Sequence, residues 1–519
     1  MPYDGPPLTT PCDIPAILAL GLKQKPNAVA VIDRDRSFTW QDLDDLSSRL
    51  AANYLELGLK AGDRIASLLP NRAVLIVHYI ACLRVGLVAN PLSYQYTANE
   101  IRRAIVDTSA SALVAHSERE PDVATADIAA QLAVDVIYYS DGAEGVSELQ
   151  RLLEREPENT SLPNISTDNA AFIIHTSGST GRPKGVTHSV GGLAWAVASI
   201  AAAFQLTSND VVLPCSSISR GGGIHLSFTT LAVGGLIVVP WTTDASELLP
   251  LMRAHHPTIM AMLPAALFQL VRSGSAVAEH FSSLRCMLSG GDKVPAELEE
   301  EFRNLAQLEI QESYGITELG IVTHNSQGES NRLGSVGKPN PGFALSLRNE
   351  EGDEVETGQV GRLWVASPTA TIGYWDNPEA TMQAMRDGWF DTGDLMRCDE
   401  DGYLWFAGRR SQIIVHDGHN ISPQEVEQAL LEHPSVALAG VVGIRNLMHG
   451  ESVRAYITIR QDAERPSHQA LIDFARERVG VNAPEEFIVL DEMPLIGDGK
   501  IDRVLLKKMT AEEKDAHQL

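Results

Sequence analysis

Hydrophobic and polar positions alternate along the first hundred residues in two periods, which predict strands and helices in turn. A short apolar run at residues 28–33 predicts a strand. Thr39 then precedes apolar residues at helical spacing and can cap a helix; these residues are Leu43, Leu46, Leu50 and Tyr54. A second strand at residues 65–69 is followed by a predicted helix over residues 73–85. Strands that alternate with helices indicate a layered α/β fold.

More apolar elements continue this alternation to residue 288. Residues 140–167 are polar and predict a surface connection. Residues 193–206 carry no charge, but many are small and weakly hydrophobic, so we expect a buried helix rather than a membrane span. Strand-like runs lie on both sides of residues 216–223. Further strands are expected at residues 171–174, 236–240, 259–263 and 284–288.

The pattern changes near residue 334 and again near residue 411. Between residues 334 and 408, short strands are separated by glycine and proline turns, which predicts a small barrel or sheet that closes the large domain. After Ser422, a proline at the first helical position begins a helix in a smaller α+β unit. We therefore expect a large multi-layer α/β domain with a small β-barrel-like part at residues 1–410, and a small mobile α+β domain at residues 411–519.

Composition excludes several classes of protein. The 519 residues exceed what one hydrophobic core usually supports. The formal net charge of -26 argues against nucleic acid or an anionic membrane surface as the main partner, because both require basic patches. The five cysteines are far apart and form no C-x-x-C pair, so neither a disulfide framework nor a zinc site is indicated. Since the N-terminus lacks a signal-peptide pattern, we expect a cytoplasmic protein without a transmembrane segment.

The densest candidate chemistry is the stretch TSGSTGRPKG at residues 176–185. Glycines let backbone N–H groups converge on an anion, hydroxyl side chains add donors, and Lys184 adds a positive charge. The stretch therefore predicts a phosphate-binding loop, although a flexible polar turn has a similar composition. It is not a Walker A loop, because Gly185 stands where that motif has Ser or Thr.

This stretch resembles the phosphate loop of the adenylate-forming superfamily, which comprises acyl-CoA synthetases, nonribosomal peptide adenylation domains and beetle luciferases. Further blocks of the family follow in order up to residue 503, and the chain looks like the acyl-CoA synthetase (fatty-acid–CoA ligase) branch. The resemblance implies ATP, Mg²⁺ and CoA as cofactors. It also implies that the nucleotide contacts Thr176, Ser177, Gly178, Ser179, Thr180, Gly181, Lys184, Gly290, Gly291, Glu312, Ser313, Tyr314, Gly315, Thr317, Asp394, Arg409 and Lys500.

Two of these blocks lie at residues 289–292 and 311–318. The first resembles the family segment that flanks adenine, where glycines let a flat ring approach the backbone. The second matches the family core Y-G-x-T-E. The resemblance implies that Tyr314 stacks near adenine, that Thr317 bonds a phosphate oxygen, and that Glu318 holds Mg²⁺, a hard cation that prefers carboxylate oxygen.

The next blocks supply the ribose contacts. Residues 388–395 resemble the block whose second aspartate binds both ribose hydroxyls, which a carboxylate can do because it accepts two hydrogen bonds. That aspartate is Asp394, whereas we expect Asp391 to be structural. Arg409 resembles the family arginine that also reaches ribose or phosphate.

The small domain carries the remaining implied residues. Ser411 occupies the hinge position, where the family normally has Asp or Lys. Gly418 corresponds to the tunnel for the pantetheine arm of CoA, where Asp417 replaces the first glycine of the family's pair. The C-terminal block resembles P-x-x-x-x-G-K-x-x-R, which implies that Lys500 lies between the substrate carboxylate and the α-phosphate and offsets their charges. Lys500, Thr317, Glu318 and Lys184 are the implied catalytic residues.

The implied reaction joins a fatty or a bulky aromatic carboxylic acid to CoA through an acyl-adenylate, with release of pyrophosphate and then AMP. Alignment with the family places the acyl pocket at Ser219, Arg220 and Gly222. Arg220 either pairs with the second carboxylate of a diacid or faces solvent or AMP. No aspartate here suits an α-amino group, which disfavours activation of amino acids.

Two other classes of function remain open from the sequence. One is a stand-alone adenylating enzyme that loads the pantetheine of a carrier protein, and the other is a non-catalytic nucleotide-binding relative. The second is disfavoured because all the implied charged residues are present. The sequence leaves open a homodimer, a carrier-protein partner and the identity of the acid.

Overall fold

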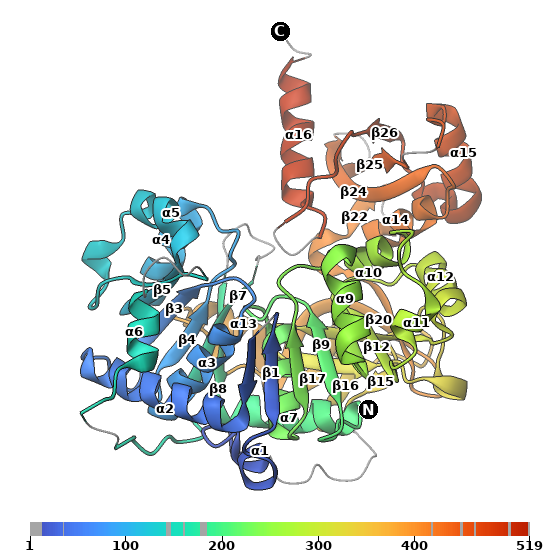
Figure 1. Cartoon of the computed structure of the whole chain (residues 1–519). Coiled ribbons are helices and arrows are strands. Elements are labelled where there is room, and N and C mark those ends of the chain that lie inside the picture. Colours follow the sequence, from blue (N-terminus) through green and yellow to red (C-terminus); the bar gives the residue numbers. More distant parts are fainter. Residues whose placement is uncertain are drawn as a thin grey trace.

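The computed structural model describes residues 13–34, 36–141, 147–158, 161–176, 184–416, 419–446, 450–460, 463–496 and 500–516. A large N-terminal part contains two sheets with helices around them, and a smaller C-terminal domain lies on one end of it (Figure 1). The mixed α/β architecture with a large and a small domain confirms the fold class that the sequence predicts. No helix of the described residues is both long and apolar enough to cross a membrane.

The first sheet has seven strands in the order β18-β8-β7-β4-β3-β5-β6. Its strands are β3 (Arg64–Leu68), β4 (Val88–Pro91), β5 (Ala112–His116), β6 (Ile137–Tyr139), β7 (Ala170–Thr176), β8 (Lys184–Ser189) and β18 (Gly373–Tyr374). The strands from β7 to β6 pair in parallel, whereas β8 is antiparallel to both of its neighbours. The phosphate-loop stretch therefore connects two antiparallel strands.

The second sheet has nine strands in the order β15-β14-β13-β12-β11-β9-β10-β1-β2. Its strands are β1 (Val29–Asp33), β2 (Arg36–Thr39), β9 (Val211–Cys215), β10 (Leu236–Val239), β11 (Ile259–Met262), β12 (Cys286–Gly290), β13 (Ile310–Ile316), β14 (Gly320–His324) and β15 (Lys338–Pro339). Six parallel strands run from β13 to β1, so their carboxyl ends meet at one edge.

Three buried helices lie between the two sheets: α3 (Ala73–Val85), α7 (Val190–Ala203) and α8 (Gly221–Ala232). Their sequences are apolar around most of the circumference, as expected for helices that are covered on all sides. One hydrophobic core includes side chains of these helices and of β1, β4, β7 and β10. The two sheets therefore share a core.

The other helices cover the outer faces or lie in connections. In the N-terminal part they are α1 (Ala19–Gln24), α2 (Trp40–Glu56), α4 (Ala98–Thr108), α5 (Glu120–Ala126), α6 (Glu148–Glu154), α9 (Ala245–His255), α10 (Pro264–Val271), α11 (Ala278–Phe281), α12 (Ala296–Ala306) and α13 (Pro378–Ala384). Thr39 forms the predicted N-terminal cap of α2, and Thr97 caps α4; each cap lies within a capping box.

A third sheet closes the large domain, and a fourth forms the C-terminal domain. The third contains β16 (Ala344–Arg348), β17 (Val360–Ala366), β19 (Met385–Arg386), β20 (Trp389–Cys398) and β21 (Leu404–Arg409). The C-terminal domain contains β22 (Ile414–His416), β23 (His419–Ile421), β24 (Val436–Asn446), β25 (Gly450–Ile459), β26 (Glu486–Val489), α14 (Pro423–Leu431), α15 (His468–Val479) and α16 (Arg503–Ala516).

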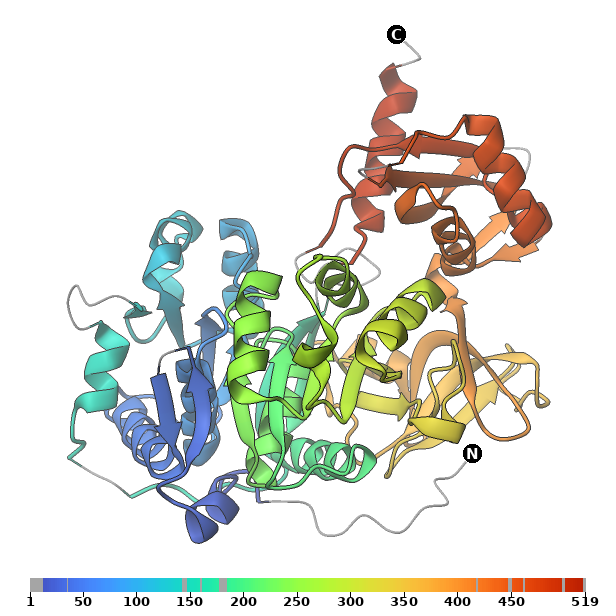
Figure 2. The ribbon, with the colours of Figure 1, turned by 45° about the vertical axis from the view of Figure 1, so that its right-hand side comes forward.

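The C-terminal domain has its own hydrophobic core and meets the large domain through polar contacts. Arg460 pairs with Glu297 of α12 at 3.0 Å, and Lys293 donates a hydrogen bond to Gln428 of α14. Figure 2 shows the small domain above the end of the large domain that carries α12. Polar contacts of this kind are typical of domains that change their relative orientation.

Two predictions from the hydrophobic pattern are wrong. The apolar run after residue 223 forms α8 rather than a strand. A segment that is buried on every side is apolar at nearly every position, so its sequence shows neither the helical nor the strand period. The polar connection at residues 140–167 contains α6, which Ser147 caps. Its buried leucines, Leu149, Leu152 and Leu153, pack into the core shared by the two sheets.

Substitution of Gly337, just before β15, tests how closely the chain must pack against β14 at this point. The φ of Gly337 is +81°, and a Cβ atom there would lie 1.8 Å from the carbonyl oxygen of His324. Gly334 has a φ of +72°, but an added Cβ would meet no atom within 4 Å. We expect Gly334→Ala to lower the free energy of unfolding by about 1–2 kcal/mol from backbone strain alone. Gly337→Ala should lose roughly 1–3 kcal/mol more from overpacking, as measured by urea denaturation. Equal losses in the two variants would contradict this account.

Candidate functional site

The sheet fixes both ends of the phosphate-loop stretch. Thr176 at the end of β7 lies opposite Lys184 at the start of β8 in the antiparallel register. The predicted nucleotide contacts Ser177, Gly178, Ser179, Thr180 and Gly181 lie outside the described residues. The pairing of β7 with β8 therefore fixes the backbone position of Lys184.

Lys184 and Glu318 meet through the ring of Tyr374 on β18. The Lys184 Nζ atom lies 4.8 Å from the centroid of this ring, and the Tyr374 hydroxyl donates to Glu318 Oε1 at 2.8 Å. Burial and the nearby Glu318 carboxylate raise the pKa of Tyr374, so the phenol keeps its proton and acts as a donor. Glu318 lies in the turn between β13 and β14, where His188 Nε2 donates to the carbonyl oxygen of Thr317 at 2.8 Å. Strands β8, β13, β14 and β18 thus bring together three of the predicted catalytic residues.

The donor set around Glu318 fits a magnesium ion that is shared with phosphates. Mg²⁺ usually takes one or two carboxylates and completes its shell with phosphate oxygens and water. In the part of the chain that the structure describes, no group of three or more His, Cys, Asp and Glu residues is placed to hold a metal. A single carboxylate next to Lys184 matches a metal that binds together with a nucleotide.

Asp394 is the most deeply buried charge of the site. Its side chain is fully inaccessible, Tyr314 donates its hydroxyl to Oδ2 at 2.6 Å, and Arg409 Nε lies 2.8 Å from Oδ1. Burial raises the pKa of Asp394, and the charges of Arg409 and Lys500 oppose this rise. Three predicted ribose and adenine residues are therefore in direct contact.

Lys500 reaches this site from the C-terminal domain. Its carbonyl oxygen accepts a hydrogen bond from Ile496 N at 2.8 Å, and Leu495 pairs with Ile501 as an antiparallel bridge. These two backbone contacts fix the positions of Lys500 and its neighbour Ile501. The predicted hinge, Ser411, lies in a short 3₁₀ turn directly after β21, whereas the predicted tunnel residue Gly418 lies outside the described residues.

The predicted adenine segment lies at the carboxyl ends of β12 and β13. Gly290 pairs with Ser313, and a Cβ at Gly290 would lie 2.4 Å from the Ser313 carbonyl oxygen, so only glycine fits. Gly291 has a φ of +83°, which also favours glycine. Glycine thus allows these two strand ends to approach each other closely.

A buried cluster of charged groups lies next to this segment; it contains the predicted nucleotide contact Glu312, whereas Glu299 and Lys293 were not predicted. Glu312 is 1% exposed and Glu299 of α12 is 4% exposed. Val294 N donates to Glu312 Oε1 at 3.3 Å, but none of the described residues donates to Glu312 Oε2 or to either oxygen of Glu299. Burial raises the pKa of Glu312 to about 8 and that of Glu299 to about 7. Burial also lowers the pKa of Lys293, which faces both carboxyls.

The predicted acyl-pocket residues lie on the loop before α8 and on its first turn. Ser219 is buried, and its hydroxyl lies 2.7 Å from that of Ser217. Arg220 donates to the carbonyl oxygen of His175 at 3.3 Å, which places the guanidinium next to the start of the phosphate loop. A Cβ added at Gly222 would meet no atom of the described residues within 4 Å, so these residues leave the space over this turn open.

Asn71, which sequence reasoning missed, holds this loop in place from the other sheet. It follows β3, and its Oδ1 accepts a hydrogen bond from Ile218 N at 2.9 Å. Its amide nitrogen donates to the Ser216 carbonyl oxygen at 3.2 Å. No motif identifies such a residue, because its partners lie about 145 positions later in the chain.

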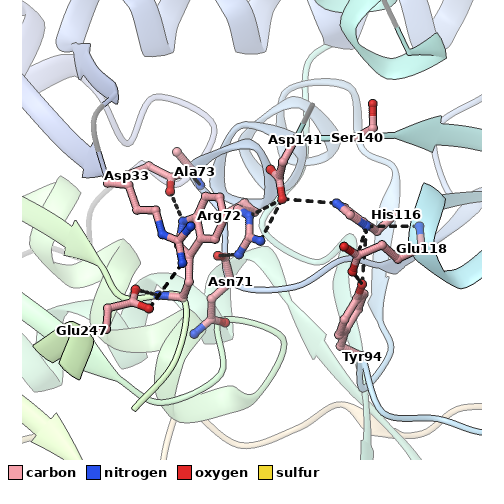
Figure 3. Close-up of polar contacts among 12 residues, drawn as sticks. Asp33, Asn71, Arg72, Ala73, Tyr94, His116, Glu118, Ser140, Asp141 and Glu247 are labelled. Atoms are coloured by element: carbon pink, nitrogen blue, oxygen red, sulfur yellow. Dashed lines mark hydrogen bonds and ion pairs between the residues drawn. The ribbon is translucent and has the colours of Figure 1, made fainter. Parts of the chain in front are cut away.

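Arg72 fixes Asn71 in turn (Figure 3). Arg72 pairs with Asp141 at 2.8 Å, and its guanidinium carbon lies 3.1 Å from the centroid of the Trp241 ring. Arg34 lies 3.4 Å from the same centroid, and two guanidinium groups this close must occupy opposite faces of the indole. The stack joins the carboxyl ends of β1, β3, β6 and β10.

Comparisons with known proteins agree with this geometry. Residues 19–375 match the family described as AMP-binding enzyme, and residues 425–500 match the AMP-binding enzyme C-terminal domain. A feruloyl-CoA synthase of an Amycolatopsis species is 29% identical over 483 residues, which cover 92% of this chain and 95% of that protein. A 2-succinylbenzoate–CoA ligase of Bacillus licheniformis is 32% identical over 500 residues, which cover 93% of this chain and 98% of that protein.

A solved structure shows the same arrangement of domains. The o-succinylbenzoate CoA synthetase of Bacillus subtilis, in complex with its acyl-adenylate intermediate, matches with a TM-score of 0.85 and 28% identity. The match covers 96% of this chain and 98% of that one. The structural similarity therefore includes both domains of this chain.

The buried carboxyl of Glu312 predicts a specific pH dependence of stability. Between pH 4.5 and about 8 the folded chain keeps a proton on Glu312 that the unfolded chain releases, so this group destabilises the fold as pH rises through that window. Glu312→Gln cannot ionise, so its stability relative to the parent should increase from pH 5 to pH 8, by up to about 1.4 kcal/mol per pH unit. Urea denaturation at four pH values measures the difference, with the exposed Glu300→Gln as control. A difference that does not change with pH would contradict the assignment.

Proposed function

The chain belongs to the AMP-binding enzyme family, and from this premise we propose that it is an AMP-forming acid–thiol ligase, an acyl-CoA synthetase. The main support for this proposal is that charged groups from both domains converge at one site. Lys184 and Glu318 meet through Tyr374, and the charge of Lys500 acts on the buried Asp394. Such a site suits a reaction in which two anions, a carboxylate and a triphosphate, must approach each other.

The first step forms an acyl-adenylate. A carboxylate oxygen of the acid attacks the α-phosphorus of ATP, and the bond between the α- and β-phosphates breaks to release pyrophosphate. Lys184 and Lys500 offset the negative charge that gathers on the phosphate oxygens, while Asp394 accepts hydrogen bonds from the ribose hydroxyls. Glu318 would hold Mg²⁺, and the metal would neutralise charge on the leaving pyrophosphate, while Thr317 would bond a phosphate oxygen.

The second step transfers the acyl group to CoA. The thiol sulfur attacks the carbonyl carbon of the acyl-adenylate, AMP leaves, and the thiol proton passes to solvent. We propose that the small domain rotates about Ser411 between the two steps and that Gly418 then lines the path of the pantetheine arm. The influence of Lys500 on Asp394 supports assigning the orientation seen here to the first step.

The names of the relatives favour an aromatic acid over a fatty acid. Feruloyl and 2-succinylbenzoate groups both carry an aromatic ring, and both relatives cover more than nine-tenths of this chain. The open space over Gly222 supports a bulky acid. Loading of a carrier protein is the alternative, since a protein-bound pantetheine would use the same path. A cytoplasmic location and a homodimer remain expectations for this enzyme.

Release of pyrophosphate tests the proposed function directly. Purified protein is incubated with Mg-ATP and a panel of aromatic, fatty and dicarboxylic acids, with and without CoA. We expect release that depends on an aromatic acid, together with a CoA thioester identified by mass spectrometry. Release without thioester would favour carrier-protein loading, and no release with any acid would contradict the proposal.

Lys500→Ala tests the role of the small domain in the first step. We expect the rate of acyl-adenylate formation to fall by about 10²–10³-fold, because an isolated charge aimed at the reacting phosphate is lost. Lys508→Ala removes an exposed lysine from α16 of the same domain and should leave the rate unchanged. The role of Lys500 is refuted if its variant retains full adenylation.

A further inference from the structure

We propose that His225 is a specificity-determining residue at the inner end of the acyl pocket, where it selects acids whose ring carries a neutral hydrogen-bonding group such as a hydroxyl. This inference rests on the proposed function, because it assumes that the acid binds over the first turn of α8. It narrows the substrate class beyond that of an aromatic carboxylic acid.

The position of His225 follows from the geometry of α8. The helix begins at Gly221, and residues three and four positions apart lie on one face of a helix. Gly221 and Gly222 therefore lie over His225, and neither has a side chain to cover it. Among the described residues, the nearest atom to a Cβ at Gly221 would be Ile174 Cδ1 at 4.0 Å, and a Cβ at Gly222 would meet none within 4 Å. Helical side chains lean toward the N-terminus of their helix, so the imidazole points toward this open turn.

Neighbouring strands hold the ring of His225 in a fixed orientation. The residue is only 3% exposed, and its ring packs edge-to-face on that of His188 of β8, with centroids 6.0 Å apart and planes at 89°. A Cβ at Gly320 of β14 would lie 3.3 Å from the ring, which shows how closely this strand approaches it. His225 thus fills the seam where β8 of one sheet and β14 of the other approach α8.

The imidazole of His225 has hydrogen-bonding capacity that the described part of the protein does not use. His188 donates its Nε2 to the Thr317 carbonyl oxygen, but none of the described residues forms a hydrogen bond with the ring nitrogens of His225. A buried polar group of this kind is destabilising unless a ligand or water satisfies it. A substituent of the bound acid is positioned to be that partner.

The charge state of His225 decides which substituent fits. Burial lowers its pKa to about 3, and the neighbouring His188, whose pKa burial lowers to about 4, adds to this effect. The neutral ring offers one donor and one acceptor, which matches a hydroxyl group. A second carboxylate would meet no positive charge on His225 or His188, and Arg220 is bonded to the His175 carbonyl. The site therefore favours a hydroxylated ring over a diacid.

Matched acids separate this inference from the proposed function. We would measure kcat/KM for thioester formation with 4-hydroxy-, 4-methyl- and 4-carboxycinnamate and with the corresponding benzoates, so that two ring distances are sampled. The hydroxylated acid of at least one series should exceed its methyl analogue by about tenfold and its carboxyl analogue by more, because a pocket built to hydrogen-bond a hydroxyl rejects analogues without one. Turnover of all three acids at similar rates would overturn this inference and leave the ligase activity established.

Variants of His225 assign the selectivity to this residue. His225→Leu should remove the preference for hydroxyl over methyl, while His225→Gln, which keeps a donor and an acceptor, should retain part of it. His280→Leu removes a histidine of similar burial from α11, outside the pocket, and should leave the ratio unchanged. Because the ratio between two acids is measured in each variant, a general loss of stability does not move it. A His225→Leu variant with the parent ratio would overturn the assignment.

Discussion

The fully buried carboxylate of Asp394 is the interaction on which the site depends. Its side chain is completely inaccessible; Tyr314 donates to Oδ2, and Arg409 forms an ion pair with Oδ1, which accepts no hydrogen bond from the described residues. Tyr314 belongs to the nine-stranded sheet, whereas Asp394 and Arg409 belong to the sheet that closes the large domain. One buried charge therefore aligns two sheets. The chain leaves Arg409 directly for the small domain, so the same contact also fixes where that domain begins.

The two larger sheets meet in a comparable way at the acyl side of the site. Asn71 reaches from β3 to the loop before α8, and the stack of Trp241 between Arg34 and Arg72 joins strand ends from both sheets. The substrate residues are therefore held by elements from both sheets rather than by one loop. Binding residues that are supported by rigid neighbours keep their geometry when the substrate arrives.

Sequence reasoning identified the fold class and the capped helix α2, and it named the blocks that carry Lys184, Glu318 and Asp394. These features depend on local periodicity, on caps or on short ordered motifs, which one sequence displays. It could not place α8, because a fully buried apolar run has no exposed face to reveal its period. It also missed Tyr374, His225 and Asn71, whose importance arises from contacts between distant segments. Tyr374 and Glu318 lie 56 positions apart in the chain, so neither hydrophobic periodicity nor a short motif could reveal their contact.

The antiparallel pairing of β7 with β8 has a consequence for the entropy of nucleotide binding. Lys184 is held by the sheet register opposite Thr176, so its backbone is ordered before any ligand arrives. A phosphate group that binds beside Lys184, as the proposed function requires, need not order the backbone of the residue that supplies the positive charge. Fixing the backbone of one residue costs roughly 1–2 kcal/mol. The sheet register thus removes this cost from the proposed binding step.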